Sequence, residues 1–524
     1  MCYNHFLFAM KYETVIGLEI HAQLQTRTKL FCRCSTEFGK TPNSLTCPVC
    51  LGLPGSLPVI NQEAVRMAVK LALALKARIN LKSLFSRKNY FYPDLPKGYQ
   101  ITQYHLPVAE NGYLEIEVNG QKKIVGIERI NLEEDAGKSL HEGFLDSAEK
   151  TYLDFNRCGL PLLEIVGRPD LRSAEEAVEF VQNLRTLLQY LQICDGNMEE
   201  GNLRCDANLS VRPAGSTEFG IKTEVKNLNS FRFLARALEY EASRQITLLE
   251  RGEKIVQETR GWDASAGQTV PQRTKEEAHD YRYFPDPDLP PLLISEDLVR
   301  EVAASLPELP QEKIDRFVRE YQLPLYDARV LTTSRILADY FEVTARATGN
   351  PKQASNWIMR EVLQYLKEKN LTIEEFPVPP ESLAELIKLV ENQTITMTMA
   401  KEKVFPEMLE QAEKIKLEKM EKEEKNKVVI TEETELIKEI KSIIDPNKII
   451  EKLNLKPIAD DQALMTIIEE VLSNNQGPVS QYLQGKAQVL GFLLGQVMKA
   501  SKGKAEPKKA QVLLKEALDR LTKK

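Results

Sequence analysis

The chain has 524 residues, of which 42% are apolar and 28% charged, and its net charge is −6 at pH 7. That length predicts two to four domains, because one hydrophobic core seldom supports so many residues. No apolar run is long enough to cross a membrane, and residues 1–10 lack the features of a signal peptide, which makes Met10 a candidate start. We expect a protein of the reducing cytoplasm. Because the net charge is negative, we expect any surface that binds nucleic acid to be confined to a basic part of the molecule.

The first half of the chain mixes predicted strands and helices. Residues 15–24 alternate apolar and polar side chains, which predicts a strand with Glu19 and His21 on one face. These two residues alone are equally consistent with an ordinary exposed face. The other predicted strands are residues 113–118, 123–130 and 209–212, and the predicted helices are residues 61–76, 173–191 and 231–251. Short connections and an irregular order predict an α+β domain with a mainly antiparallel sheet.

Four cysteines follow the first strand in two close pairs, Cys32 with Cys34 and Cys47 with Cys50. Two pairs of thiolates on short turns can close a tetrahedral site around one zinc ion. Two disulfides are the alternative, although nothing else in the sequence suggests an oxidising compartment. We favour zinc in a structural site, because four cysteines leave no open position for a substrate.

The second half of the chain is predicted to be helical. The proline-rich segment 285–291 ends the first domain, because it cannot continue a helix or the interior of a sheet. We place a helical domain at residues 295–409, a Lys/Glu-rich insertion or linker at 410–445 and a small helical tail domain at 446–524. From Lys499 on, nine basic residues face three acidic ones, which suits either a solvated tail or contact with phosphates.

The common nucleotide-binding and catalytic motifs are missing: there is no GxxxxGK[ST], no GxGxxG after a strand, no HExxH and no GxSxG. Dense polar stretches stand out instead, at residues 88–99, 131–138, 154–164, 198–208 and 222–232. They offer oxygen ligands for Mg²⁺ and cations for polyphosphate, the candidate cations being Lys88, Lys97, Arg157, Lys222 and Lys226. Glu164 lies inside an apolar run, where a carboxylate needs a partner such as a metal ion. The pattern favours phosphoryl transfer or ATP-dependent activation of a carboxylate.

The stretch 88–99 also carries four aromatic residues among its lysines and prolines. Such a loop can present cations and stacking faces to a nucleotide or a nucleic acid. A well-packed surface loop is the alternative.

The polar stretches resemble a known family. The segments IGLEIHAQL, CPVCLGLPGSLP, YFYPDLPKGYQI, NLEEDAGKS, NRCGLPLLEIV, EEGNLRCDANLSVR, EVKNLNSFR and AHDYRYFPDPDLPPL, in that order, resemble the B subunit of the Asp/Glu-tRNA amidotransferase. GFLLGQVMKASKGKA resembles the end of the same protein, so the resemblance covers nearly the whole chain. It implies an α+β "cradle" catalytic domain at residues 1–294, followed by a helical domain and a tail that binds tRNA.

The resemblance also implies a two-step reaction. ATP phosphorylates the side-chain carboxylate of Glu-tRNA(Gln) or Asp-tRNA(Asn), and ammonia then displaces the phosphate to give the amide. By similarity, Glu19, His21, Glu134 and Glu164 fall on the metal-binding positions of the kinase site and are expected to be catalytic. Histidine is an unusual ligand for Mg²⁺, so His21 would bind a softer ion or orient a metal-bound water. The four cysteines match a zinc site of the family.

Ammonia is expected to come from partners, because the sequence shows no Ser-Ser-Lys amidase signature. The family uses an amidase-fold A subunit, which releases ammonia from glutamine, and a small C subunit. The chain departs from the family in the Lys/Glu-rich run near residues 411–445 and in His105, where aspartate is common.

Two other functions compete. One is a non-catalytic, zinc-stabilised scaffold that binds tRNA, which would need none of the carboxylates Glu19, Glu134 and Glu164. The other is a stand-alone ligase for a small free acid, which would leave the helical region and the basic tail without a purpose.

Overall fold

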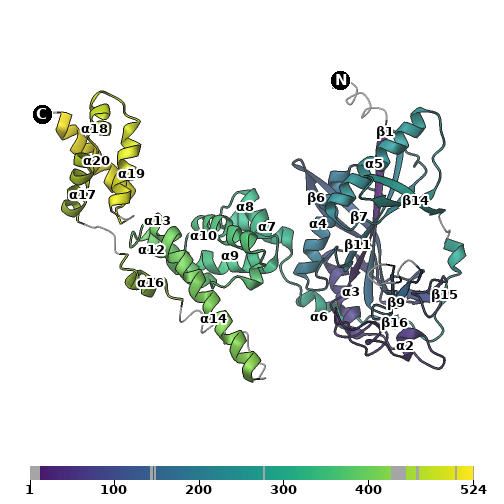
Figure 1. Ribbon diagram of the computed structural model, residues 1–524. Coiled ribbons are helices and arrows are strands. Elements are labelled where there is room, and N and C mark those ends of the chain that lie inside the picture. The colour runs from purple at the N-terminus through teal and green to yellow at the C-terminus, as the bar shows by residue number, and fades with distance from the viewer. Residues whose placement is uncertain are drawn as a thin grey trace. The chain divides into compact units, whose positions relative to one another are not determined.

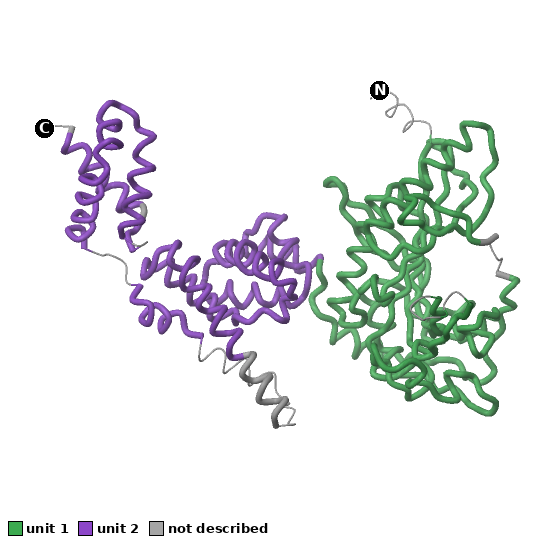
Figure 2. The backbone as a smooth tube through the Cα atoms, in the orientation of Figure 1, with its two compact units in different colours: residues 1–310 green, residues 311–524 purple. Residues whose placement is uncertain are grey.

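The computed structural model describes residues 12–141, 146, 149–274, 278–426, 444–455, 460–501 and 504–522. The chain forms two compact units, residues 1–310 and residues 311–524 (Figure 2). The candidate start at Met10 and residues 427–443 of the predicted insertion lie outside the described residues.

A nine-stranded sheet forms the centre of the first unit (Figure 1), with the strand order β14-β13-β12-β11-β1-β10-β7-β6-β2. Only β12 and β13 pair in parallel, and the other neighbours are antiparallel. In chain order these strands are β1 (Tyr12–Gln23), β2 (Arg78–Ile79), β6 (Ala109–Val118), β7 (Gln121–Glu134), β10 (Pro161–Gly167), β11 (Leu203–Pro213), β12 (Thr223–Lys226), β13 (Glu258–Asp263) and β14 (Gln268–Thr274). The prediction of an α+β fold with a mainly antiparallel sheet is confirmed.

One face of this sheet is apolar and packs against three helices, α3 (Gln62–Ala74), α4 (Ala174–Tyr190) and α5 (Phe231–Glu250). Alternate residues of β1, such as Leu18, Ile20 and Ala22, contribute to this core with at most 2% exposure. The three helices are the ones predicted from sequence. Ser173 caps α4 by accepting the backbone N–H of Glu176, as its capping-box pattern predicts.

The described part of this unit also contains three small sheets and three short helical segments. The sheets are β15-β4-β5, β16-β3 and β8-β9, formed by β3 (Lys82–Ser83), β4 (Ser86–Asn89), β5 (Tyr99–Thr102), β8 (Lys138–Leu140), β9 (Tyr152–Asp154), β15 (Phe284–Pro285) and β16 (Leu292–Leu293). The helical segments are α2 (Pro48–Leu51), η1 (Ala278–Tyr281) and α6 (Glu296–Ala304).

The opposite face of the nine-stranded sheet is polar where its central strands meet. His21 of β1 pairs with Glu164 of β10 on one side and with Arg204 of β11 on the other. Glu164 in turn pairs with Asn131 of β7. Because residues directly opposite in paired strands project to the same face, these four side chains form one row across the sheet.

The second unit is helical over its described residues and contains two cores. The larger core is built from α7 (Pro310–Glu320), α8 (Leu325–Leu331), α9 (Arg335–Thr348), α10 (Pro351–Trp357), η2 (Ile358–Val362), α11 (Leu363–Lys369), η3 (Ile373–Glu375), α12 (Pro380–Glu391), α13 (Met397–Met399), η4 (Ala400–Val404), α14 (Phe405–Asn426) and α16 (Pro446–Lys452). The smaller core joins α17 (Asp461–Asn474), α18 (Gln476–Leu483), α19 (Val489–Ala500) and α20 (Pro507–Thr522). None of the described helices combines the length and the apolar character that a membrane span requires.

Candidate active site

An acid–histidine cluster lies on the polar face of the central sheet. We use this name for Glu19 and His21 of β1, Glu133 of β7 and Glu164 of β10. The His21 Nε2 atom lies 3.4 Å from Oε1 of Glu133, 3.8 Å from Oε1 of Glu19 and 3.9 Å from Oε1 of Glu164. Three carboxylates therefore surround one imidazole.

The carboxylates of the cluster influence one another strongly. Burial, followed by the charges of Glu133 and Glu19, raises the pKa of Glu164 to about 7. Burial also acts to raise the pKa of Glu19, but the charge of His21 and the hydrogen bond with Glu164 outweigh it, so that this pKa is lowered. Crowded carboxylates with opposed pKa shifts are typical of functional sites.

The geometry of the cluster fits a divalent cation. One donor atom from each of Glu19, His21 and Glu164 lies within 4.8 Å of the other two. The Asn131 side chain donates its amide to Glu164, while its buried Oδ1 atom has no hydrogen-bond partner among the described residues. Carboxylate and amide oxygens suit Mg²⁺, and the imidazole fits a softer ion or a metal-bound water equally well.

The structure does not bring Glu134 into this cluster. Glu134 accepts hydrogen bonds from the Lys97 ammonium and, at 3.0 Å, from the backbone N–H of Ile101. The cluster contains the preceding residue, Glu133, whose Oε2 also accepts a hydrogen bond from Thr102 Oγ1 at 3.0 Å. Adjacent residues of a strand point to opposite faces, so only one of the two glutamates can reach His21.

The signal that would have selected Glu133 is present in the sequence. Ile130 and Leu132 are both fully buried in the apolar core, so their neighbours Asn131 and Glu133 belong to the polar face. The same alternation places Glu134, two residues after Leu132, on the face of the strand that is turned towards the core. Sequence reasoning missed Glu133 and Asn131 because the three consecutive acids were not assigned to faces.

Of the five predicted cations, Lys226 and Lys88 lie close enough to the cluster to shift the pKa of one of its carboxylates. Lys226 Nζ lies 2.6 Å from Oδ2 of Asp206 and 3.3 Å from Oε1 of Glu224. The charges of Lys226 and Lys88 both lower the pKa of Glu19. Among the predicted cations, these two lysines are therefore the ones whose charges act on a carboxylate of the cluster.

The other three predicted cations have different surroundings. Arg157 donates to the backbone carbonyls of Ala136 and Gly137 at 3.1 and 2.6 Å, so it supports the loop after β7. Lys222 is exposed immediately before β12 and forms no ion pair with a described residue. Lys97 is buried in its pair with Glu134, with side-chain exposures of 8% and 3%.

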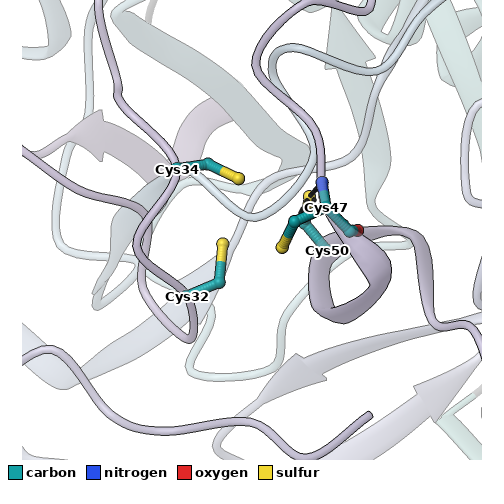
Figure 3. A group of neighbouring side chains, drawn as sticks. All are labelled: Cys32, Cys34, Cys47 and Cys50. Carbon is teal, nitrogen blue, oxygen red and sulfur yellow. Dashed lines mark hydrogen bonds between the residues drawn. The ribbon is translucent and has the colours of Figure 1, made fainter.

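The four predicted zinc ligands converge as expected from their spacing. The Sγ atoms of Cys32, Cys34, Cys47 and Cys50 all lie within 4.8 Å of one another, and Figure 3 shows the two pairs facing a common centre. Zinc bonds of about 2.3 Å place tetrahedral sulfurs about 3.8 Å apart, so the four thiols fit a zinc ion. The seven described cysteines are all free thiols, which argues against the disulfide alternative.

A buried lysine lies beside the cysteines. Lys29 is 0% exposed, and its Nζ donates to the carbonyl of Leu45 at 2.8 Å and contacts Sγ of Cys50 at 3.7 Å. No described carboxylate forms an ion pair with it. The hydrogen bond with Cys32 is the main cause that lowers the pKa of Cys50, and burial opposes it. The backbone N–H of Cys47 and then the charge of Lys29 lower this pKa further, to about 5. The lysine was not singled out from sequence, because nothing local marks it as buried.

A cavity of about 210 Å³ lies next to both the cysteine loops and the Lys97–Glu134 pair. Its lining includes Cys32, Cys50 and Gly159 together with Lys97 and Glu134. The cysteine site and the buried ion pair therefore line the same cavity.

Comparisons with known proteins identify the family. The chain matches the GatB/GatE catalytic domain over residues 14–300 and the GatB domain over residues 339–518. It is 50% identical over 505 residues to the B subunit of the aspartyl/glutamyl-tRNA(Asn/Gln) amidotransferase of Thermodesulfovibrio yellowstonii, covering 96% of this chain and 99% of that protein. The corresponding B subunit of Halorhodospira halophila is 52% identical over 512 residues, covering 97% of this chain and 100% of that protein. These matches extend over both units, so the chain belongs to the family of aspartyl/glutamyl-tRNA(Asn/Gln) amidotransferase B subunits.

Proposed function

We propose that this chain activates and amidates the amino acid of a misacylated tRNA. ATP phosphorylates the side-chain carboxylate of Glu-tRNA(Gln), Asp-tRNA(Asn) or both, and ammonia then attacks the acyl carbon and expels phosphate. A carboxylate is a poor acylating group until one of its oxygens becomes a phosphate leaving group. The observation that carries this proposal is the acid–histidine cluster on the polar face of a sheet within the matched catalytic domain.

The residues of the cluster have separate tasks in this reaction. Glu19 and Glu164 hold negative charge close together, which favours a divalent cation between them and the phosphates of ATP. A bound Mg²⁺ supplies charge neutralisation of the polyphosphate. Lys226 and Lys88 lie where they can contact phosphate oxygens, and Asn131 holds the Glu164 carboxylate in place.

Ammonia reaches this site from partner proteins. The sequence carries no amidase signature, and the relatives are named as one subunit of an amidotransferase. We therefore propose a heterotrimer with an amidase-fold A subunit that hydrolyses glutamine and a small C subunit. The assembly would work in the cytoplasm, where aminoacyl-tRNA is made.

The helical tail is the proposed tRNA-binding module. Lys508, Lys515 and Arg520 are exposed on α20, the last described helix. Phosphate contacts of this kind give affinity but do not distinguish one tRNA from another. Selection of the tRNA would therefore come from its shape or from a few base contacts. The cysteine site is proposed to hold a structural zinc ion, since all four positions are protein ligands.

The test uses the chain reconstituted with its A and C partners. Misacylated tRNA, ATP, Mg²⁺ and ammonium chloride are supplied without glutamine, and the amidated aminoacyl-tRNA is quantified for the wild type and for Glu164→Gln. ATP-dependent product that the substitution removes supports the proposal. Equal product from both proteins contradicts a role of the cluster and favours the tRNA-binding scaffold. Amidation of a free acid without tRNA would favour the stand-alone ligase.

A further inference from the structure

Five tyrosines form a continuous chain of rings beside the acid–histidine cluster. In spatial order they are Tyr92, Tyr90, Tyr281, Tyr283 and Tyr104, and we call them the tyrosine chain. Successive ring centroids lie 5.9, 6.2, 5.9 and 4.1 Å apart, and the last pair, Tyr283 with Tyr104, is stacked at an interplanar angle of 8°. The rings come from three separate segments, just after β4, just after β5 and at the end of η1, which together build one aromatic surface.

Hydrogen bonds of neighbouring residues hold the segments after β4 and β5 near the cluster. Thr102 Oγ1, at the end of β5, donates to Glu133, and Tyr104 lies two residues further along the chain. Tyr90 OH lies 3.4 Å from Oε1 of Gln100, whose amide donates to the backbone carbonyl of Glu134 at 2.7 Å. Burial and then the charges of Glu164 and Glu133 raise the pKa of Tyr283, which agrees with its place beside the cluster.

Cations accompany the rings. Lys88 Nζ lies 4.8 Å from the ring centroid of Tyr281 and 5.8 Å from that of Tyr90. Further out, the guanidinium of Arg282 lies 6.0 Å from the ring of Phe91, which is 76% exposed. Aromatic faces with interspersed cations are the combination that proteins use to bind single-stranded nucleic acid.

We propose that the tyrosine chain binds the unpaired 3′ end of the tRNA and holds its last bases against the rings. This inference rests on the proposed function, in which the aminoacyl group esterified to the 3′-terminal adenosine must reach the cluster. The adenine of ATP is the other purine in the reaction, but one adenine needs one stacking site. A chain of five rings extends beyond the reach of one base, and Tyr92 at one end of it is 48% exposed, which suits contact with successive nucleotides.

The experiment measures binding without turnover. The full chain is titrated with uncharged tRNA and with the same tRNA lacking its three 3′-terminal nucleotides, in the absence of ATP. We expect the wild type to bind the intact tRNA at least about 5-fold more tightly, the loss typical of one stacked base. Tyr281→Leu and Tyr283→Leu should abolish that difference, whereas Tyr281→Phe and Tyr283→Phe, which keep the ring, should preserve it.

Other results overturn the inference. Equal binding of intact and shortened tRNA by the wild type contradicts it without the need for any variant. A loss of affinity for a non-hydrolysable ATP analogue in the leucine variants, with unchanged tRNA binding, would assign the rings to the nucleotide. If the leucine variants unfold, crosslinking of the wild type by tRNA with 8-azidoadenosine at its 3′ end decides the question, because the adduct must fall on a peptide of the tyrosine chain. Failure of the proposed function would show as absent amidation, with this binding difference unaffected.

Discussion

His21 and Glu133 lie 3.4 Å apart between Nε2 and Oε1, closer than His21 lies to either of the other two carboxylates in the cluster. The contact crosses two strand boundaries, because β10 separates β1 from β7 in the sheet. It assigns Glu133 to the centre of the candidate site, a position for which the family resemblance suggested Glu134.

Glu133→Gln is predicted to lower the rate of amide formation by about 100-fold or more, since it removes the negative charge nearest His21, beside the proposed cation ligands. The Mg²⁺ concentration required for half-maximal activity should rise as well. Initial rates in the reconstituted ammonium-dependent reaction, measured over a Mg²⁺ titration, check both effects. A normal rate with a normal Mg²⁺ dependence would remove Glu133 from the site.

Glu134→Gln is predicted to act mainly on stability. It leaves the Lys97 ammonium, which is 8% exposed, without its carboxylate partner, and breaking a buried ion pair costs about 3 kcal/mol. Denaturant unfolding should show this loss, and Lys97→Met combined with Glu134→Gln should recover part of it. A Mg²⁺ requirement shifted by Glu134→Gln as strongly as by Glu133→Gln would contradict the assignment.

Lys29→Met is predicted to weaken zinc binding by about 10- to 100-fold, the range found for groups that support metal ligands. Four thiolates around one Zn²⁺ carry a net charge of −2, and the Lys29 ammonium is the buried cation in contact with Cys50. Competition with a chromogenic chelator gives the affinity. Lys40→Met is the matched control, because Lys40 lies on the same loop region but is 48% exposed and pairs with Glu37. Equal zinc affinity in both variants would refute the role of Lys29.

The stability of the larger helical core should fall in acid because of Glu342. Burial acts to raise the pKa of Glu342, but the hydrogen bond from Arg316 and the charge of Lys313 outweigh it and lower this pKa to about 2 from an ordinary value of 4.5. A lowered pKa in the folded state stabilises the fold fully above pH 4.5, and this contribution is lost as the pH falls towards 2.

Glu342→Gln measures this contribution. The free energy of unfolding of the wild type should exceed that of the variant by about 1–2 kcal/mol near neutral pH, allowing for solvent screening, and the difference should shrink on acidification. A difference that does not change with pH would show that Glu342 stabilises by packing alone.

The exposed basic residues of α20 are predicted to contact tRNA phosphates. Replacing Lys508, Lys515 and Arg520 with glutamine should weaken tRNA binding and reduce the slope of log affinity against log salt by about 2–3, close to one unit for each lost phosphate contact. Lys352→Gln with Lys367→Gln, two exposed lysines of the larger helical core, provides the control. An unchanged salt slope in the triple variant would place the tRNA elsewhere.

The sequence by itself determined the local elements and the chemistry they carry. Alternation in residues 15–24 predicted β1 and the shared face of Glu19 and His21, because a strand has a side-chain period of two. The spacing of the four cysteines predicted their convergence, because two close pairs on short turns can meet without help from distant residues. The family resemblance, carried by long and unusual motifs, was confirmed over nearly the whole chain.

Only the tertiary structure decided which of these residues meet. It brought Glu133 of β7 within 3.4 Å of His21 of β1, a contact that the alternation in β7 permits but does not specify, because it depends on how the strands are ordered in the sheet. The burial of Lys29 against Cys50 and the contact of five tyrosines from three segments are also visible only in the folded chain. Burial and contact between residues far apart in the chain arise from packing, and packing is a property of the whole fold that no local pattern contains.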